Sequence, residues 1–390
     1  MKRVLFIFGT RPEAIKLCPV ILYFQQQNSE LGVRVCVTAQ HRDMLDQVLT
    51  IFGVRPDYDL NLMLPGQTLH QSTARILAGL EPVLMRERPD FVLVQGDTTT
   101  TLCGALASFY AGVPVGHVEA GLRTGNVRQP FPEEMNRVLT TRLCTLHFAP
   151  TAAAAENLRQ EGVPQSHITI TGNPGIDAVL YVKQRLESGQ LPGAHLPGLP
   201  VGRKLILVTA HRRESFGEGL ERICRALAAL AQIPGVHLVY PVHPNPHVRG
   251  PVYRLLKGVP NITLLEPLGY APFVDLMRRA YLLLTDSGGI QEEGPSLGKP
   301  VLVMREATER NEAVQAGTAR LVGSNVDRIV AEVERLLNSP AEYEAMSRIH
   351  NPYGDGHASS RIWSAIHSFL RSNRSSMAPT PAAEPAGQGA

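Results

Sequence analysis

The feature that most constrains the fold is a repeated alternation of short apolar runs with longer amphipathic segments. Five such runs occur in the first half of the chain, at residues 4–8, 33–38, 91–95, 113–119 and 168–171. Each run is nearly continuous in apolar residues, as expected for strands that helices cover on both faces. Strands that alternate with helices predict βαβ units and a parallel sheet. The first half is therefore expected to form a doubly wound α/β domain.

The same alternation restarts after a break. Residues 188–203, SGQLPGAHLPGLPVGR, are rich in Pro and Gly and show no periodicity, which is typical of a connection between domains. Five further runs follow, at residues 204–210, 236–242, 261–267, 280–286 and 299–304. A chain of 390 residues also exceeds the roughly 250–300 at which one hydrophobic core stops growing. A second doubly wound domain is therefore predicted.

These patterns predict the domain boundaries. The first domain is expected at 1–172 and the second at 173–357. Apolar residues at helical spacing predict a last helix at 358–373, with Ser359 or Ser360 as its N-cap. The tail at 374–390 is rich in Pro, Ala and Gly, and we expect it to be disordered.

Composition excludes several classes of function. The formal net charge is only +3 and no basic block occurs, so a nucleic-acid partner is disfavoured. No stretch approaches the roughly 18 consecutive apolar residues that a membrane span requires. The cysteines are odd in number and never in a CxxC spacing, which predicts reduced thiols in the cytoplasm and no structural metal. They are Cys18, Cys36, Cys103, Cys144 and Cys224.

Two segments have the features of a phosphate site. The first run ends at Gly9, which permits a tight turn, and Pro12 suits the first position of a helix. Arg11 and Lys16 would flank the start of that helix, where both can reach a diphosphate. The alternative is a solvated basic helix start.

The second segment follows a run of the second domain. Ser287, Gly288 and Gly289 open a helical stretch, and their backbone N–H groups can approach an oxyanion closely. Glu293 would lie one turn further on, where it can bind sugar hydroxyls such as those of a ribose, cap the helix or face solvent. No GxGxxG follows any run, so a nicotinamide or flavin cofactor is disfavoured. The bound anion is then part of the substrate, and no cofactor is expected.

Carboxylates form the second group of candidate residues. Asp97 and Glu119 each end an apolar run, and the carboxyl ends of parallel strands meet in one crevice. Glu133 lies in the loop FPEEMNR, with Arg137 one helical turn later, where it can hold Glu133 or contact substrate. Paired carboxylates whose pKa values are driven apart carry out proton transfer. Alternatively, Asp97 caps a helix and Glu133 sits in a first helical turn.

His211 follows the first run of the second domain, in the segment TAHRRES. It can donate to a phosphate or move a proton near neutral pH. A solvated loop histidine is the alternative.

Taken together, several segments closely resemble the non-hydrolysing UDP-N-acetylglucosamine 2-epimerases of bacteria. They are GTRPEAIK, TAQHRDMLDQVL, GDTTTT, GHVEAGLRTG, FPEEMNR, HRRESFGEG, TDSGGIQEEGPSLGKPVLVMR and NPYGDG, in this order from residue 1 to about residue 370. The resemblance implies two Rossmann-like domains in a GT-B glycosyltransferase-like architecture with a cleft between them. The last helix would cross back to complete the first domain.

The resemblance also implies roles for individual positions. The UDP-binding positions match Arg11, Lys16, Ser287, Gly288, Gly289, Glu293 and Arg310, with Phe273 near the uracil. The catalytic set matches Asp97, Glu119, Glu133, Arg137 and His211, of which Asp97, Glu119 and His211 also contact substrate. Some members bind a second, regulatory UDP-N-acetylglucosamine through positions that match Gln40, His41, Arg212 and His243.

Such enzymes interconvert UDP-N-acetylglucosamine and UDP-N-acetylmannosamine by eliminating UDP, through 2-acetamidoglucal, and adding it back. The resemblance therefore implies no metal and no NAD, a homodimer, and a supply of N-acetylmannosamine for surface polysaccharide. The chain departs from the family pattern at Pro174-Gly175, at Gly294 and at Asn311. A glycosyltransferase, a catalytically silent UDP-sugar sensor, and hydrolytic release of N-acetylmannosamine are the alternatives.

Overall fold

The computed structural model describes residues 1–27, 31–38, 42–64, 66–194, 200, 202–348 and 350–375. Gln40 and His41, two of the predicted regulatory positions, lie outside these residues. The predicted tail also lies outside them, except that its first two residues continue the last helix.

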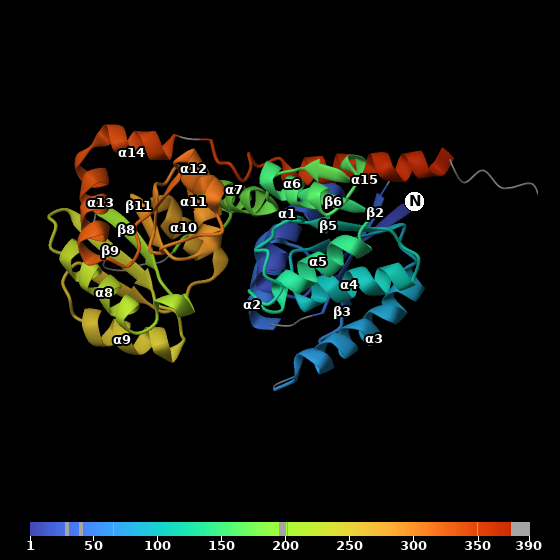
Figure 1. The fold of residues 1–390 in the computed structure, drawn as a ribbon, viewed down its shortest axis with the longest axis horizontal. Helices are drawn as coiled ribbons and strands as arrows, with labels where there is room; N and C mark the ends of the chain where they lie inside the picture. The colour runs from blue at the N-terminus through green and yellow to red at the C-terminus, as the bar shows by residue number, and fades with distance from the viewer. Residues whose placement is uncertain are drawn as a thin grey trace, which may run out of the picture.

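Strands and helices alternate along the described chain (Figure 1). The strands of the first sheet are β1 (Lys2–Phe8), β2 (Leu31–Val37), β3 (Tyr58–Asp59), β4 (Phe91–Gln95), β5 (Val115–Val118), β6 (Leu146–Ala149) and β7 (Ile168–Ile170). Those of the second are β8 (Lys204–Thr209), β9 (Val236–Pro241), β10 (Ile262–Leu265), β11 (Leu282–Thr285), β12 (Val301–Val303) and β13 (Ala319–Leu321).

The helices up to the connection are α1 (Arg11–Gln26), α2 (Arg42–Phe52), α3 (Leu69–Glu87), α4 (Thr99–Tyr110), α5 (Glu133–Leu143), α6 (Ala152–Gln160) and α7 (Pro174–Glu187). After it come α8 (Glu218–Leu230), α9 (Pro246–Leu256), α10 (Tyr270–Arg279), α11 (Gly288–Ser296), α12 (Asn311–Ala316), α13 (Val326–Asn338), α14 (Pro340–Ser347) and α15 (Ala358–Ser375). Two short 3₁₀ turns are η1 (Gln165–His167) and η2 (Arg213–Ser215).

Both sheets are parallel and doubly wound, which confirms the predicted fold class. The first has the order β3-β2-β1-β4-β5-β6-β7 and the second the order β10-β9-β8-β11-β12-β13. In each sheet the first strand of the domain is third in the order, inside the sheet, and the chain winds outward in both directions from it. Ligands bind beside such reversal points, outside the carboxyl ends of the strands.

Three strands were missing from the predicted set. They are β3, β6 and β13, which are only two to four residues long. The run Leu146–Ala149 contains His147, whose pKa burial lowers to about 3, so a polar residue sits neutral in a buried strand. Short strands that carry polar residues are recognised by the pairing they make and not by a periodic pattern.

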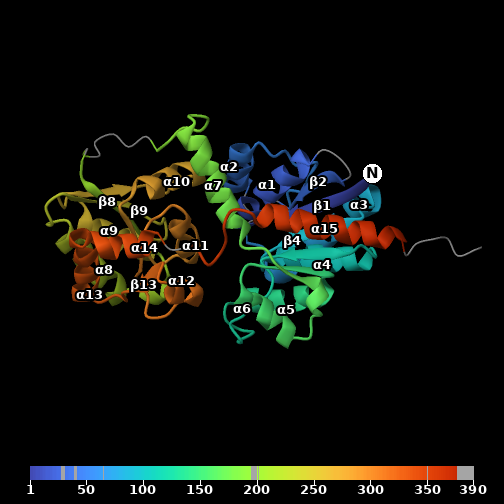
Figure 2. The same cartoon turned by 90° about the horizontal axis from the view of Figure 1, so that it is seen from above.

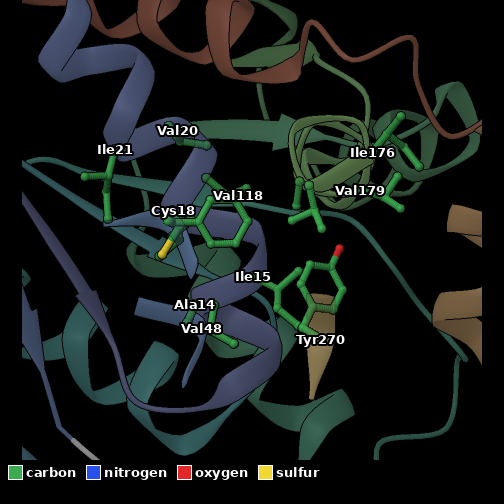
Figure 3. Packing of buried hydrophobic residues seen from close by; sticks show 14 of the residues in the cluster. Ala14, Ile15, Cys18, Val20, Ile21, Val48, Val118, Ile176, Val179 and Tyr270 are labelled. Atoms are coloured by element: carbon green, nitrogen blue, oxygen red, sulfur yellow. The ribbon is translucent and has the colours of Figure 1, made fainter. Parts of the chain in front are cut away.

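The two domains share a buried boundary built around α7. This helix packs against α1 and α15 on one side and against α10 and α11 on the other. In Figure 3, Tyr270 of α10 lies beside Ile15 of α1, with Ile176 and Val179 of α7 nearby, and all four belong to one buried cluster. The cores of both domains therefore meet at the helix that connects them.

The last helix, α15, lies along the first domain and packs against α1 (Figure 2). Its first backbone N–H groups, those of Ala358 and Ser359, donate to the carboxylate of Asp177 at 3.3 and 2.8 Å. The predicted serine caps are therefore wrong. Asp177 comes from α7, and a carboxylate there also complements the helix dipole.

The chain passes between the domains twice, and the two crossings touch. The backbone N–H of Asn173 donates to the carbonyl of Tyr353 at 2.7 Å. A Cβ on Gly172 would come within 3.2 Å of the Cα of Gly354, and Gly172 has a φ of 83°. Glycine is therefore required where the two crossings approach each other.

Candidate active site between the domains

A buried carboxylate, Glu13, shapes the loop at the end of β1. Its side chain accepts hydrogen bonds from the backbone N–H groups of Gly9 and Thr10, at 2.9 and 2.7 Å. It also accepts from the hydroxyls of Thr98 and Thr101, at 2.6 and 3.1 Å. Burial raises the pKa of Glu13, and these donors oppose that rise. Glu13 therefore ties the loop that carries Arg11 to the loop that carries Asp97.

Asp97 follows β4 and faces α5. Its carboxylate pairs with Arg137, which approaches at 2.6 Å through Nη2 and at 3.0 Å through Nε. The helix that follows is capped by Thr98, whose hydroxyl accepts from Thr101 N–H at 3.2 Å, so the interpretation of Asp97 as the cap is wrong. Its carboxylate is instead held by Arg137 of α5.

Arg137 also pairs with Glu134, at 3.0 Å. Among the described residues the carboxylates that it holds are thus Asp97 and Glu134, and not Glu133 as predicted. Glu134 is buried, and the backbone N–H groups of Thr124 and Gly125, which donate to it at 2.9 and 3.1 Å, offset the cost of that burial. Glu133 lies in the first turn of α5, with its side chain in the cavity described below.

Glu119 follows β5, next to β4 in the sheet, and is the centre of a buried polar cluster. It has a φ of 65°, a left-handed conformation that is unfavourable for a non-glycine residue and recurs at functional sites. Lys16 contacts its Oε1 at 2.5 Å, and Gln95 donates to its Oε2. Burial would raise the pKa of Glu119, but Lys16 and, beyond it, two arginines hold that pKa below its usual value. The carboxylate is therefore ionised and paired.

The cluster continues into the second domain. Asn173 donates to Glu119 at 3.2 Å and to Glu292 of α11 at 2.9 Å, and Glu292 accepts from Arg310 Nε at 2.7 Å. The guanidinium of Arg310 lies over Gly288, where an added Cβ would meet it at 3.3 Å. The structure thus brings Lys16, Glu119 and Arg310 together. Asn173 and Glu292 were missed, although Glu292 lies inside a segment that carries the family resemblance and Asn173 directly precedes the Pro174-Gly175 departure.

A third acid, Glu293, lies beside Arg11 at the same boundary. Burial, followed by the neighbouring charge of Glu292, raises the pKa of Glu293 to about 8. The interpretation of Glu293 as an exposed carboxylate is therefore wrong. Burial lowers the pKa of Arg11, opposed by Tyr270 and Glu293. A protonated Glu293 can donate a hydrogen bond as well as accept one.

This pKa predicts how stability depends on pH. Glu293 titrates near 4.5 when unfolded and near 8 when folded, so the folded state holds the extra proton. Its contribution is therefore greatest below pH 4.5 and is lost as the pH rises through about 8. We expect urea unfolding of the wild type and of Glu293→Gln to diverge as pH rises toward 8, in favour of the variant. Parallel stability curves would contradict the assignment.

His211 lies at the start of the second domain, against a fully buried aspartate. Asp286 accepts from the backbone N–H groups of His211 and Arg212, at 2.6 and 2.7 Å, and its Oδ1 lies 3.3 Å from His211 Nδ1. Burial lowers the pKa of His211, although Asp286 opposes this. The ring stacks on His243 with 5.3 Å between centroids. Asp286 therefore sets the orientation of His211, and sequence reasoning did not single it out.

A cavity of about 830 Å³ lies between the two domains, beside Glu133 and His211. From the first domain it is lined by Thr124, Asn126, Gln129, Pro130, Phe131 and Glu133. From the second it is lined by His211, Arg212, Arg213, Glu214, Arg305 and Glu309. Its size is in the range of ligand pockets. The first domain contributes the acid Glu133 to the lining, and the second domain contributes both basic and acidic side chains.

The remaining predicted positions lie around the second domain's edge of this boundary. Ser287 and Gly288 begin α11, with Ser287 half-buried and Gly289 exposed. Phe273 sits in the first turn of α10 and is half-buried against the shared core. Within the described ranges, no three His, Cys, Asp or Glu side chains are grouped so that they could hold a metal ion.

Comparison with known proteins decides the family. The sequence profile of UDP-N-acetylglucosamine 2-epimerase matches residues 25–367. The chain belongs to the UDP-N-acetylglucosamine 2-epimerase family. It is 57% identical over 380 residues to UDP-N-acetylglucosamine 2-epimerase of Escherichia coli K12, covering 96% of this chain and 100% of that one. The corresponding enzyme of Salmonella typhimurium is 56% identical over 372 residues, covering 94% and 99%.

Solved structures agree with this family. UDP-GlcNAc 2-epimerase from Neisseria meningitidis, bound to UDP-GlcNAc, is 49% identical with a TM-score of 0.85, covering 95% of this chain and all of that one. The glycosyltransferase SnogD of Streptomyces nogalater is 16% identical with a TM-score of 0.58, covering 95% and 99%, and it shares the fold alone. The predicted family and GT-B-like architecture are both confirmed. The chain is an epimerase, and therefore an isomerase.

Proposed function

We propose that the protein interconverts UDP-N-acetylglucosamine and UDP-N-acetylmannosamine without releasing free sugar. The observation that carries the proposal is the boundary between the domains, where Glu119 with Lys16 is linked through Asn173 and Glu292 to Arg310 of the second domain. Beside it lies a cavity that Glu133 lines from the first domain and His211 from the second. Inversion at carbon 2 requires removal of an unactivated ring proton and its return to the opposite face. It also requires cations that stabilise departing UDP.

We assign the proton transfers jointly to Asp97, Glu119 and Glu133. Asp97 and Glu119 stand at the ends of neighbouring strands, and Glu133 faces the cavity from α5. Arg137 holds Asp97 in place, and His211, oriented by Asp286, serves the diphosphate. Two acids on opposite faces of one ring are what an epimerisation by elimination and addition needs.

The remaining cations and amides are assigned to UDP. Arg11, Lys16 and Arg310 offer positive charge, and the start of α11 offers the N–H groups of Gly288 and Gly289. Ser287 extends this cradle, Glu293 binds the ribose, and Phe273 packs against the uracil. The elimination intermediate, 2-acetamidoglucal, is retained with UDP when the cleft closes about the two crossings.

Proton NMR in deuterated water tests the reaction. Purified protein is incubated with UDP-N-acetylglucosamine without NAD, metal or acceptor. We expect UDP-N-acetylmannosamine with deuterium at carbon 2. Free N-acetylmannosamine would indicate hydrolysis, and an unchanged substrate that still binds would indicate a transferase or a sensor.

We also propose a homodimer joined through α3 and α4. Three large side chains there are exposed: Met85 by 68%, Phe109 by 59% and Tyr110 by 75%. Met85 and Tyr110 line a largely apolar cavity of about 380 Å³, and Phe109 is the sequence neighbour of Tyr110. A contiguous exposed apolar patch of this kind marks an interaction surface.

Light scattering tests the dimer. The wild type is expected at twice the chain mass of 42.5 kDa, and Tyr110→Arg at one chain mass. Ile170→Arg, which changes another exposed apolar residue on the edge strand β7, is the control and should remain dimeric. A wild type at 42.5 kDa would refute the proposal.

A second, regulatory UDP-N-acetylglucosamine remains part of the proposal. Arg212 lines the cavity and His243 stacks on His211, so both can reach a ligand next to the reacting sugar. We further propose a cytoplasmic location, supported by five free cysteines, and a role in supplying N-acetylmannosamine for surface polysaccharide. No helix in the described part of the chain is long and apolar enough to cross a membrane.

A further inference from the structure

The two domains are joined inside the site by the side-chain amide of Asn173. Asn173 is almost fully buried, at 1% exposure, and it begins α7 at the first crossing. Its Oδ1 accepts from the backbone N–H of Gly175 at 2.9 Å. Because that N–H can only donate, the amide orientation is fixed, and the NH₂ group must point away from the helix.

The NH₂ group meets one carboxylate from each domain. Glu119 Oε1 lies 3.2 Å from Nδ2 and Glu292 Oε2 lies 2.9 Å from it. An amide nitrogen has two hydrogens, so one can serve each acid. The contact is therefore complete only while both domains are in their present relative position.

Glu292 is itself placed between two donors. Its Oε2 accepts a hydrogen bond from Asn173 Nδ2, and its Oε1 accepts one from Arg310 Nε at 2.7 Å. The residue is 5% exposed. Only a carboxylate can accept at both ends, because the amide of a glutamine would turn a donor toward one of its neighbours. The pairing through Nε leaves Nη2 of Arg310 beside Gly288, while Nη1 lies 3.6 Å from the carboxylate of Glu309.

We propose that Asn173 and Glu292 form a positioning pair that links the domain arrangement to Glu119 and Arg310. Asn173 supplies the ionised Glu119 with an N–H that only the assembled boundary can provide. Glu292 aims Arg310 at the diphosphate. The proposal rests on the proposed function and adds that the two halves of the site are set together and not independently.

Asn173→Ser separates this role from helix capping. Serine is as good an N-cap as asparagine but does not reach either acid. The matched control is Asn325→Ser, which makes the same change at the exposed cap of α13, where the side chain accepts from Arg328 N–H. We expect Asn173→Ser to lower kcat on the order of 10-fold, below the ~10²-fold that an ångström of misplacement can cost. The control should turn over like the wild type.

The pH profile provides a readout that a loss of packing would not move. Glu119 faces the charges of Lys16, Arg310 and Arg137, all of which Asn173→Ser retains. Loss of the N–H removes one donor to the ionised form, so Glu119 becomes harder to ionise. The limb of the pH–rate profile that reports the ionisation of Glu119 should therefore move to higher pH, whether Glu119 acts as the acid or as the base. An unmoved profile would overturn the assignment to Glu119.

Calorimetric titration with UDP tests the Arg310 half without turnover. We expect Glu292→Gln to weaken UDP binding about 10-fold and Asn173→Ser to weaken it a few-fold. In each variant the hydrogen bond between residue 292 and the guanidinium of Arg310 is weakened, so the guanidinium is no longer held toward the diphosphate. The double variant should bind no more weakly than Glu292→Gln alone, because both changes break one linked unit. Losses of UDP affinity that add up in the double variant, or an unchanged UDP affinity in Glu292→Gln, would overturn the proposed positioning pair.

Two further results keep the test decisive. If Asn173→Ser does not fold, Asn173→Asp keeps the cap and the shape but turns an oxygen toward two carboxylates. It should then lower kcat more than serine would, and wild-type turnover would overturn the proposal. A wild type that binds UDP without epimerising would refute the proposed function, while the UDP titrations would still decide the pair.

Discussion

Glu119→Gln is expected to lower kcat by ~10²–10⁴-fold, the range that a positioned acid–base group contributes. The change keeps the shape of the side chain but removes the charge that Lys16 contacts at 2.5 Å. Because burial disfavours the charged lysine, the pKa of Lys16, now raised by Glu119 and Glu292, should fall in the variant. Substrate turnover and deuterium incorporation at carbon 2 measure the result.

A matched control comes from the same domain. Glu87, at the end of α3, is also buried and paired, accepting from Arg3 at 3.2 Å and from the Tyr58 hydroxyl at 2.5 Å. Glu87→Gln should therefore cost stability but leave kcat unchanged. Equal losses of turnover in both variants would mean that Glu119 acts through the fold and not through the chemistry.

Arg310→Ala is the second change with a large expected effect. We expect it to weaken UDP binding roughly 10²-fold and to lower the free energy of unfolding by about 3–5 kcal/mol, because the buried charge of Glu292 loses its ion-pair partner and keeps only the neutral amide of Asn173. Glu292 pairs with Arg310 at 2.7 Å and is 6% exposed at its side chain. Calorimetry with UDP and urea unfolding measure the two effects separately.

Its control is Arg335→Ala. Arg335 also makes a short ion pair, at 2.5 Å to Glu342, but its side chain is 50% exposed. Exposed pairs contribute only about 0–1 kcal/mol, so stability should change little and UDP affinity not at all. A loss of stability in Arg310→Ala as small as in this control would show that Glu292 is solvated and not buried.

Much of the fold could be predicted because it depends on local patterns. The buried strand β4 coincides with the predicted run, since a central parallel strand is apolar on both faces. The strand β6 was missed because four residues, one of them His147, carry too little pattern. Its place in the sheet depends on pairing with β5, which no local segment reveals.

The candidate site could also be predicted only in part. Asp97 and Glu119 could be predicted because strand ends in one sheet must converge. The partner of Arg137 could not, since helical spacing suggests Glu133 whereas the contact that forms reaches Asp97 from another segment. Asn173 and Glu292 are 119 positions apart and meet only because α7 and α11 pack together. Such contacts are properties of the assembled boundary.

The placement of α15 determines the order in which the molecule can be completed during synthesis. Residues 358–375 pack against α1, which spans Arg11–Gln26, so the first domain needs segments from both ends of the chain. Domains usually fold as units while the chain emerges from the ribosome. Here the second domain can acquire its core first, while the face of α1 that packs against α15 is covered only after α15 has been made. A nascent chain stalled before Ala358 would expose that apolar surface to chaperones.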